Sequence, residues 1–69
     1  MTREQIREAI IEMDCLDQKE ADTLATMIHK AVETGKEEDR QKATTIIDWL
    51  YETYSITLRN WMEMKDLYC

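Results

Sequence analysis

The fold is decided by residues 43–68, which read ATTIIDWLYETYSITLRNWMEMKDLY. At helical spacing this stretch carries two apolar stripes. The first stripe has steps of three or four residues and contains Ala43, Ile47, Leu50, Tyr54, Leu58 and Trp61. The second stripe lies on another face and contains Trp49, Ile56 and Leu67. We expect the first stripe to close a core within the chain and the second to meet another molecule.

The rest of the 69-residue chain also favours helices, because it has no proline and only one glycine. Thr2 and Gln5 form a capping-box pattern that predicts a first helix from Arg3 to Met13. Its expected apolar face contains Ile6, Ala9, Ile10 and Met13. The predicted fold class is all-α, in a single domain over residues 1–69.

A second helix is predicted after Asp17, which is followed by Glu20 in the first turn. This helix should end at Thr34, because Gly35 can adopt the left-handed conformation that stops a helix. Its expected apolar face contains Ala21, Leu24, Ala25, Ile28 and Val32.

The third predicted helix is long and begins with the charged run Lys36–Arg40, where Glu38 and Lys42 can pair. It runs to Asp66, with a possible kink near Ser55 where weaker helix formers gather. At about 1.5 Å per residue it is longer than the second helix, so the first helix should cover the remainder. The expected architecture is a helical hairpin or three-helix arrangement with a long C-terminal helix.

Such a hairpin is only two helices thick, so each helix keeps a bare side. A chain this short buries only about 60% of its unfolded surface, and association between subunits can supplement its core. The residues expected at a subunit interface are Ile46, Trp49, Ile56, Met64 and Leu67. We therefore expect a homo-oligomer, with the chain itself as one partner.

The charge balance disfavours nucleic acid as a partner, because the chain has nine basic and fifteen acidic residues and a net charge of −6. The start of the chain lacks an apolar signal segment, and no stretch suggests a membrane span. We expect a cytoplasmic protein, in the host cytosol if a phage encodes it, with Cys15 and Cys69 as free thiols. Cys15 is expected to pack between helices.

No residue set predicts a reaction, so an enzyme, a cofactor and a catalytic residue are not expected. His29 is the only histidine and with Glu33 offers two metal ligands at most. The acidic cluster around the second helix start lacks the spacing of a calcium loop and is expected to serve helix capping; it contains Asp14, Asp17, Glu20 and Asp22. No metal site is predicted.

All five aromatic residues fall in residues 49–68, which places any ring stacking there. Core and interface packing explains them. The alternative is a small pocket between subunits, where an aromatic ring would stack on a flat ligand and a basic side chain would meet an anion. The residues of this alternative ligand site are Lys30, Tyr51, Tyr54 and Arg59.

One family resemblance concerns residues 16–60. Leu16, Gln18, Glu20, Asp22, Lys30, Glu33 and Gly35 resemble the first arm of helical-hairpin proteins that phages use against CBASS immunity. Residues 39–59, with Leu50, Glu52, Tyr54 and Arg59, resemble a shortened second arm. The resemblance implies a small, helical, homo-oligomeric sponge that sequesters cyclic nucleotides without cleaving them. Met13 and Ile28 stand where that family is expected to have a pocket tyrosine and a lysine, so only Arg59 carries over.

Two functions from different classes are therefore expected. The leading hypothesis is a non-catalytic inhibitor from a phage or mobile element that binds and sequesters a host defence or regulatory protein. The alternative is a homo-oligomeric sponge for cyclic nucleotide signals. A DNA mimic is a third idea, which the dispersed acidic residues argue against.

Overall fold

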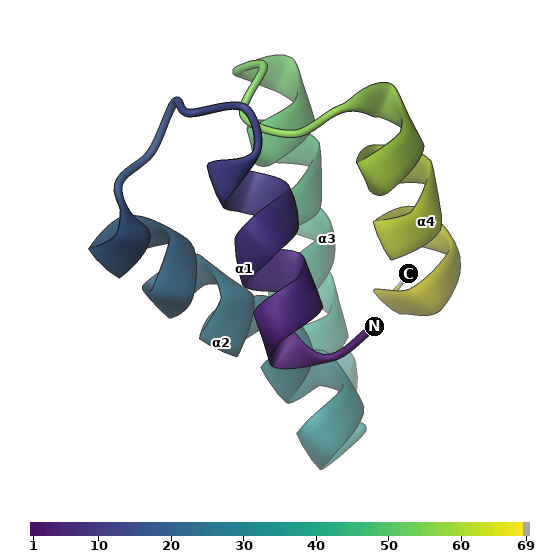
Figure 1. The fold of residues 1–69 in the computed structure, drawn as a ribbon. Coiled ribbons are helices and arrows are strands. Elements are labelled where there is room, and N and C mark those ends of the chain that lie inside the picture. The colour runs from purple at the N-terminus through teal and green to yellow at the C-terminus, as the bar shows by residue number, and fades with distance from the viewer. Residues whose placement is uncertain (69) are drawn as a thin grey trace.

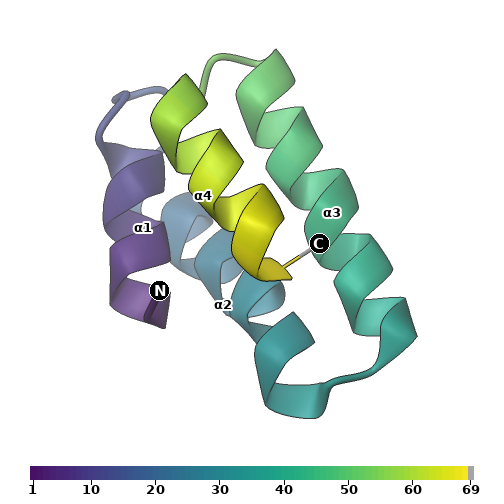
Figure 2. The same cartoon turned by 90° about the vertical axis from the view of Figure 1, so that its right-hand side faces the viewer.

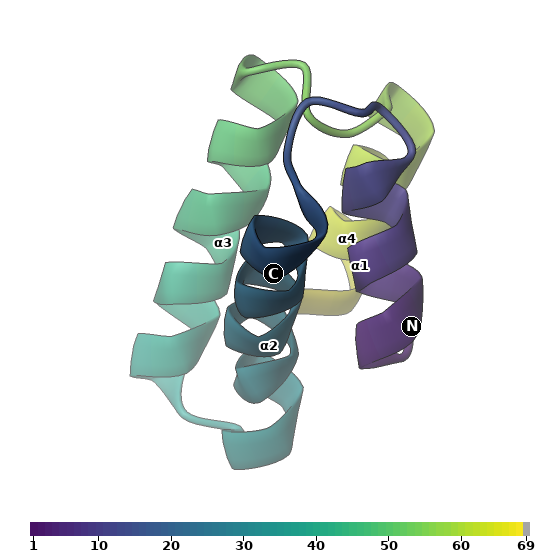
Figure 3. The same ribbon diagram turned by 60° about the vertical axis from the view of Figure 1, so that its left-hand side comes forward.

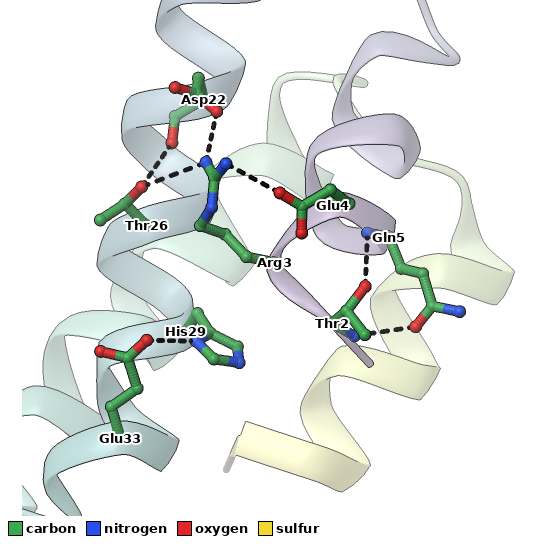
Figure 4. A network of polar contacts seen from close by, with 8 residues as sticks. All are labelled: Thr2, Arg3, Glu4, Gln5, Asp22, Thr26, His29 and Glu33. Atoms are coloured by element: carbon green, nitrogen blue, oxygen red, sulfur yellow. Dashed lines mark hydrogen bonds and ion pairs between the residues drawn. The ribbon is translucent and has the colours of Figure 1, made fainter.

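The computed structural model describes residues 1–68, and the capping residues chosen from the sequence begin its first two helices. The Thr2 hydroxyl accepts a hydrogen bond from the Gln5 amide at 3.1 Å, and the Gln5 side chain accepts one from the Thr2 amide at 2.8 Å (Figure 4). This confirms the capping box that opens α1, Arg3–Ile11. The helix stops two residues earlier than predicted, and Met13 lies in the following turn with 39% of its surface exposed.

The second helix, α2, spans Gln18–Thr34 and has the predicted ends. Asp17 accepts a hydrogen bond from the Glu20 amide at 2.8 Å. Gly35 ends the helix with a φ of 65°, a left-handed conformation that glycine adopts without strain because it has no Cβ. Val32 is 59% exposed, so its predicted place on the core face is wrong. The buried face instead contains Ala21, Ala25, Ile28 and Ala31.

The predicted long third helix is wrong, because residues 37–68 form two helices. They are α3, Glu37–Glu52, and α4, Leu58–Tyr68. Between them Tyr54 has a φ of 61°, and the Ser55 amide donates to the Leu50 carbonyl at 2.8 Å, which closes the end of α3. Thr57 then caps α4 by accepting from the Asn60 amide at 3.1 Å. The chain reverses here, and α4 returns beside α3 (Figure 2).

The four helices surround one core, and consecutive helices pack against each other. Figure 1 shows α1 in front of α3, with α2 and α4 on either side. The all-α prediction is confirmed, and residues 1–68 contain no strand. The predicted hairpin that is two helices thick is replaced by a four-helix arrangement, because the reversal at residues 53–57 folds the expected long arm in half. No helix of the described chain is both long and apolar enough to cross a membrane.

This reversal moves part of the second apolar stripe into the core. Ile56 is 2% exposed and Met64 is fully buried, so the prediction that both face a partner is wrong. Of the first stripe, Tyr54 and Leu58 were expected in the core but are exposed. The buried apolar residues are Ile6, Ala9, Ile10, Ala21, Ala25, Ile28, Ala31, Ala43, Ile47, Leu50, Ile56, Met64 and Tyr68.

Candidate functional site

The turns before α2 and before α4 have the same local geometry, with an offset of 40 residues along the chain. Asp14 and Tyr54 are both left-handed, with φ of 55° and 61°. The amide of each donates to the carbonyl three residues before it, at 2.8 and 3.1 Å. Three residues later, Asp17 and Thr57 cap the next helix. The chain therefore uses one turn design twice.

The two turns lie at the same end of the molecule and touch (Figure 1). The Cys15 thiol donates to the Tyr54 carbonyl at 3.4 Å and to the Met13 carbonyl at 3.5 Å. Asn60 adds a second link by donating to Glu12 at 3.0 Å. Cys15 is exposed in this loop, so its predicted place between helices is wrong. Cys69 lies outside the described residues.

Three apolar side chains and one arginine are exposed at or beside this contact. We call Met13, Tyr54, Leu58 and Arg59 the turn-end surface. Tyr54 is 78% exposed and Leu58 is 53% exposed. Within residues 1–68 the Arg59 guanidinium has no hydrogen bond or ion pair. This end of the molecule thus offers apolar area together with an uncommitted positive charge.

Tyr54 is the unusual residue of the turn-end surface. A left-handed backbone costs roughly 1–2 kcal/mol for a residue with a bulky side chain, whereas aspartate and asparagine tolerate it better. Asp14 fits its turn, but a tyrosine in the same conformation is strained. Its ring recovers little burial in exchange, because most of it faces solvent. A strained residue with little packing role in its own chain is a starting point for a functional hypothesis.

The four predicted ligand residues are not brought together in one chain. Tyr51 stacks on Trp61 with ring centroids 4.8 Å apart, so one face of its ring is already covered. Lys30 lies 12 residues into α2, about 18 Å along the helix from the end nearest the turns. Tyr54 lies in the turn before α4 and Arg59 in the first turn of α4, so both are at the same end of that helix and remain exposed.

Asp48 joins α3 to α4 through two donors on α4. Trp61 donates its ring N–H to Asp48 at 3.1 Å, and Lys65 forms an ion pair with the same carboxylate at 3.1 Å. The hydrogen bond from Trp61 has the largest influence and holds the pKa of Asp48 below its ordinary value. Burial opposes this effect, and Lys65 adds to the lowering. Lys65 also lies 5.9 Å from the centre of the Trp61 ring. These contacts hold α4 in place and leave no open site.

A second exposed apolar region follows the seam between α2 and α3. We call it the α2–α3 groove and define it by Leu24, Met27, Ile46 and Trp49. It contains two hollows, of about 520 and 320 Å³, at its two ends. Met27 is 42% exposed and Trp49 is 45% exposed, while Leu24 and Ile46 are half-buried. Figure 3 shows the two helices side by side.

Two of the five predicted interface residues therefore lie on the α2–α3 groove, where Ile46 lines one hollow and Trp49 lines the other. Leu67 is exposed but lies on α4, outside this groove. The sequence reasoning missed Leu24 and Met27 as groove residues and Met13 and Leu58 as exposed ones. The recurrence of an apolar residue followed by a cap, at Leu16 and at Ile56, could have indicated the second turn.

The polar network between α1 and α2 is structural (Figure 4). Arg3 contacts Asp22, Thr26 and Glu4, and the hydrogen bond with Asp22 raises the pKa of its guanidinium. His29 and Glu33 are 2.8 Å apart on α2, the pair expected from the sequence. Within residues 1–68 no three histidine, cysteine or acidic side chains are grouped as a metal site would require.

Comparison with known proteins adds no relative to this geometry. No family model, no curated protein and no solved structure matches the chain. The surfaces described above are therefore the basis for a functional interpretation.

Proposed function

We propose that this chain is a non-catalytic binding protein that captures a protein partner on the turn-end surface and acts by occupying it. In this proposal the partner is a host defence or regulatory protein, and the chain is an inhibitor from a phage or mobile element. The source and the kind of target rest on the sequence resemblance alone.

The observation that carries the proposal is the exposed, strained ring of Tyr54. Tyrosine is among the residues that contribute most to protein interfaces, because its large rigid ring buries area with little loss of conformational freedom. Tyr54 combines 78% exposure with a left-handed backbone that disfavours it. A partner that buries the ring would account for its presence in the turn.

The neighbours of Tyr54 suit the same task. Leu58 and Met13 are also exposed and add apolar area in the two adjoining turns, and methionine adapts well to irregular partner surfaces. Arg59 can form a two-pronged hydrogen-bonded pair with a partner carboxylate, since no side chain of the described residues engages it. A partner with an apolar pocket and an acidic rim fits this chemistry.

Affinity capture tests the proposal. The tagged wild-type chain is compared with Tyr54→Ala and Leu58→Ala in lysates of bacteria that express it. The matched control is Val32→Ala, which changes a similarly exposed apolar residue on α2. We expect a protein that the wild type and the control retain and that both turn variants lose. Equal recovery by all four chains, or recovery of no protein at all, contradicts the proposal.

The alternative function, a sponge for cyclic nucleotides, is supported by the common location of Tyr54 and Arg59. An exposed ring can stack on a base, and a free guanidinium can pair with a phosphate. Lys30 and Tyr51 would have to come from a neighbouring subunit or play no part, given their positions. Of the four predicted ligand residues, only Tyr54 and Arg59 can therefore act together within one chain.

Calorimetry against a panel of cyclic mono- and dinucleotides separates the two functions. Submicromolar binding that Arg59→Ala abolishes favours the sponge, and the effect of Lys30→Ala shows whether Lys30 of a neighbouring subunit takes part. The absence of heat for every nucleotide in the panel removes the sponge and leaves the protein-binding proposal to the capture experiment.

A further inference from the structure

We propose that the α2–α3 groove is covered by a second copy of this chain, in a two-fold dimer that is separate from the turn-end surface. The proposal concerns a different face from the one assigned to partner capture. It rests on the apolar floor of the groove, on its charge and on its size.

The floor of the groove is too apolar to be explained as ordinary surface. Leu24 and Met27 of α2 face Ile46 and Trp49 of α3, and together they follow the seam between the two helices. Exposed apolar groups that form one continuous patch mark contact sites, whereas single exposed ones do not. Trp49 and Met27 are of the types enriched in the centres of interfaces.

The charge of the groove favours a second copy as the occupant. Its rims carry Lys19 and Glu20 at one end and Glu38 and Lys42 at the other, two bases and two acids. The whole chain has a net charge of −6, so the excess of acids lies elsewhere. Two identical acidic molecules repel on most faces but can meet on this neutral one. A strongly basic partner finds no excess of negative charge here.

The geometry also fits a two-fold axis that runs along the groove. Helices α2 and α3 are antiparallel neighbours, and such an axis sets α2 of one copy against α3 of the other. Every helix of the resulting layer then has antiparallel neighbours, as in an up-and-down four-helix bundle. The hollows at each end can receive Trp49 and Met27 of the second copy.

The available area is at the lower limit of what a specific dimer needs. Helix α3 has 16 residues and is about 24 Å long, and two helices side by side are about 20 Å wide. Each copy can therefore contribute about 500 Å², close to the minimum of about 1,000 Å² in total for a specific interface. The chain's own core is small and rich in alanine on α2, so burial of this face supplements it.

Sedimentation equilibrium of the full chain at micromolar concentrations tests the dimer. We expect the wild type to have twice the mass of one chain. Trp49→Glu and Met27→Glu should each raise the dimer Kd at least ten-fold, because a charge placed on the floor would be buried unpaired. Leu67→Glu is the matched control on α4, with 48% exposure, and should leave the Kd unchanged. Circular dichroism of each variant verifies that the monomer remains helical.

Disulfide trapping gives a second, independent readout. In a background of Cys15→Ser and Cys69→Ser, a mixture of the Met27→Cys chain and the Ile46→Cys chain should form a disulfide-linked dimer under mild oxidation, because the axis sets α2 of one copy against α3 of the other. The Met62→Cys chain should not. A monomer at all concentrations, or a dimer that Trp49→Glu and Met27→Glu leave intact, overturns the proposal. Tyr54→Ala should not affect dimerisation, so failure of partner capture and failure of the dimer are distinguished.

Discussion

Asp14 and Tyr54 hold the same left-handed backbone position in two turns that touch each other, although only aspartate is suited to it. The contact runs from the Cys15 thiol to the Tyr54 carbonyl, at 3.4 Å. Because the two turns share their geometry, Asp14 serves as an internal reference for what the turn requires. The ring of Tyr54 is then the part that the turn itself does not need.

Replacement of Tyr54 by asparagine should therefore stabilise the chain. We expect the free energy of unfolding to rise by about 1 kcal/mol, because asparagine tolerates the left-handed conformation. Little burial is lost, since the tyrosine is 78% exposed. Urea denaturation measures the change, and Asp14→Asn is the control, expected to stay within about 0.5 kcal/mol. A stability loss with Tyr54→Asn would show that the ring supports the fold.

Ile56 and Leu67 were assigned to one exposed stripe, but only Ile56 is buried. Truncation of the two side chains should therefore have different effects on stability. Ile56→Ala should lower the free energy of unfolding by roughly 2–5 kcal/mol, because Ile56 is 2% exposed and its truncation opens a cavity in the core. Leu67→Ala should change stability by no more than about 0.5 kcal/mol, since Leu67 is 48% exposed. Thermal and urea unfolding of both variants check the contrast. Similar costs at the two positions would argue against the reversal at residues 53–57.

The helix ends that could be predicted are those with a local chemical signal. Thr2 and Gln5, Asp17 and Gly35 each satisfy backbone groups within a few residues, so sequence alone locates them. The end of α3 is marked less clearly, because its one signal is the pair Ile56 and Thr57, which repeats the pattern of Leu16 and Asp17. No glycine or proline falls in residues 53–57, and the apolar spacing continues through the turn as if the helix did.

The candidate site was predictable only in part for the same reason. Tyr54 and Arg59 were predicted to contact a ligand, and both are exposed, whereas the place also given to Tyr54 in the core stripe is wrong. Met13 was assigned to the core because the first helix was extended by two residues. Whether a side chain in these turns is buried depends on the direction in which the next helix begins. That direction is set by packing between segments that are distant in the sequence.

Asp48→Asn should weaken the joint between α3 and α4. Its carboxylate accepts from Trp61 at 3.1 Å and pairs with Lys65, but its side chain is 40% exposed, so solvent screens the pair. We expect a loss below about 1 kcal/mol at neutral pH. Asp66→Asn, at an exposed position on α4, is the control and should have no effect.

Acid should remove the difference between wild type and Asp48→Asn. The pKa of Asp48 is lowered in the folded chain from an ordinary value of 3.8. Its contribution is complete above that value and is lost as the pH falls through the lower pKa of the folded state. Urea titrations at pH 7 and below pH 3.8 test this. A gap that stays constant in acid would mean that the charge of Asp48 is not what stabilises the joint.

Tyr68→Phe should remove the hydrogen bond that joins α4 to the start of the chain. The Tyr68 hydroxyl donates to the Met1 carbonyl at 3.1 Å and the residue is 3% exposed, so its loss should cost about 1 kcal/mol at pH 7. The same residue predicts a dependence on alkaline pH. Burial raises the pKa of Tyr68 above its ordinary value of 10.0, and Glu63 adds a smaller effect in the same direction. The unfolded chain can then ionise where the folded chain cannot, so wild-type stability falls as the pH rises above that value. We expect the advantage over Tyr68→Phe to shrink above pH 10.0, which urea denaturation at pH 7 and above pH 10.0 measures. An advantage that persists unchanged in alkali would indicate that Tyr68 ionises as readily in the folded chain as in the unfolded one.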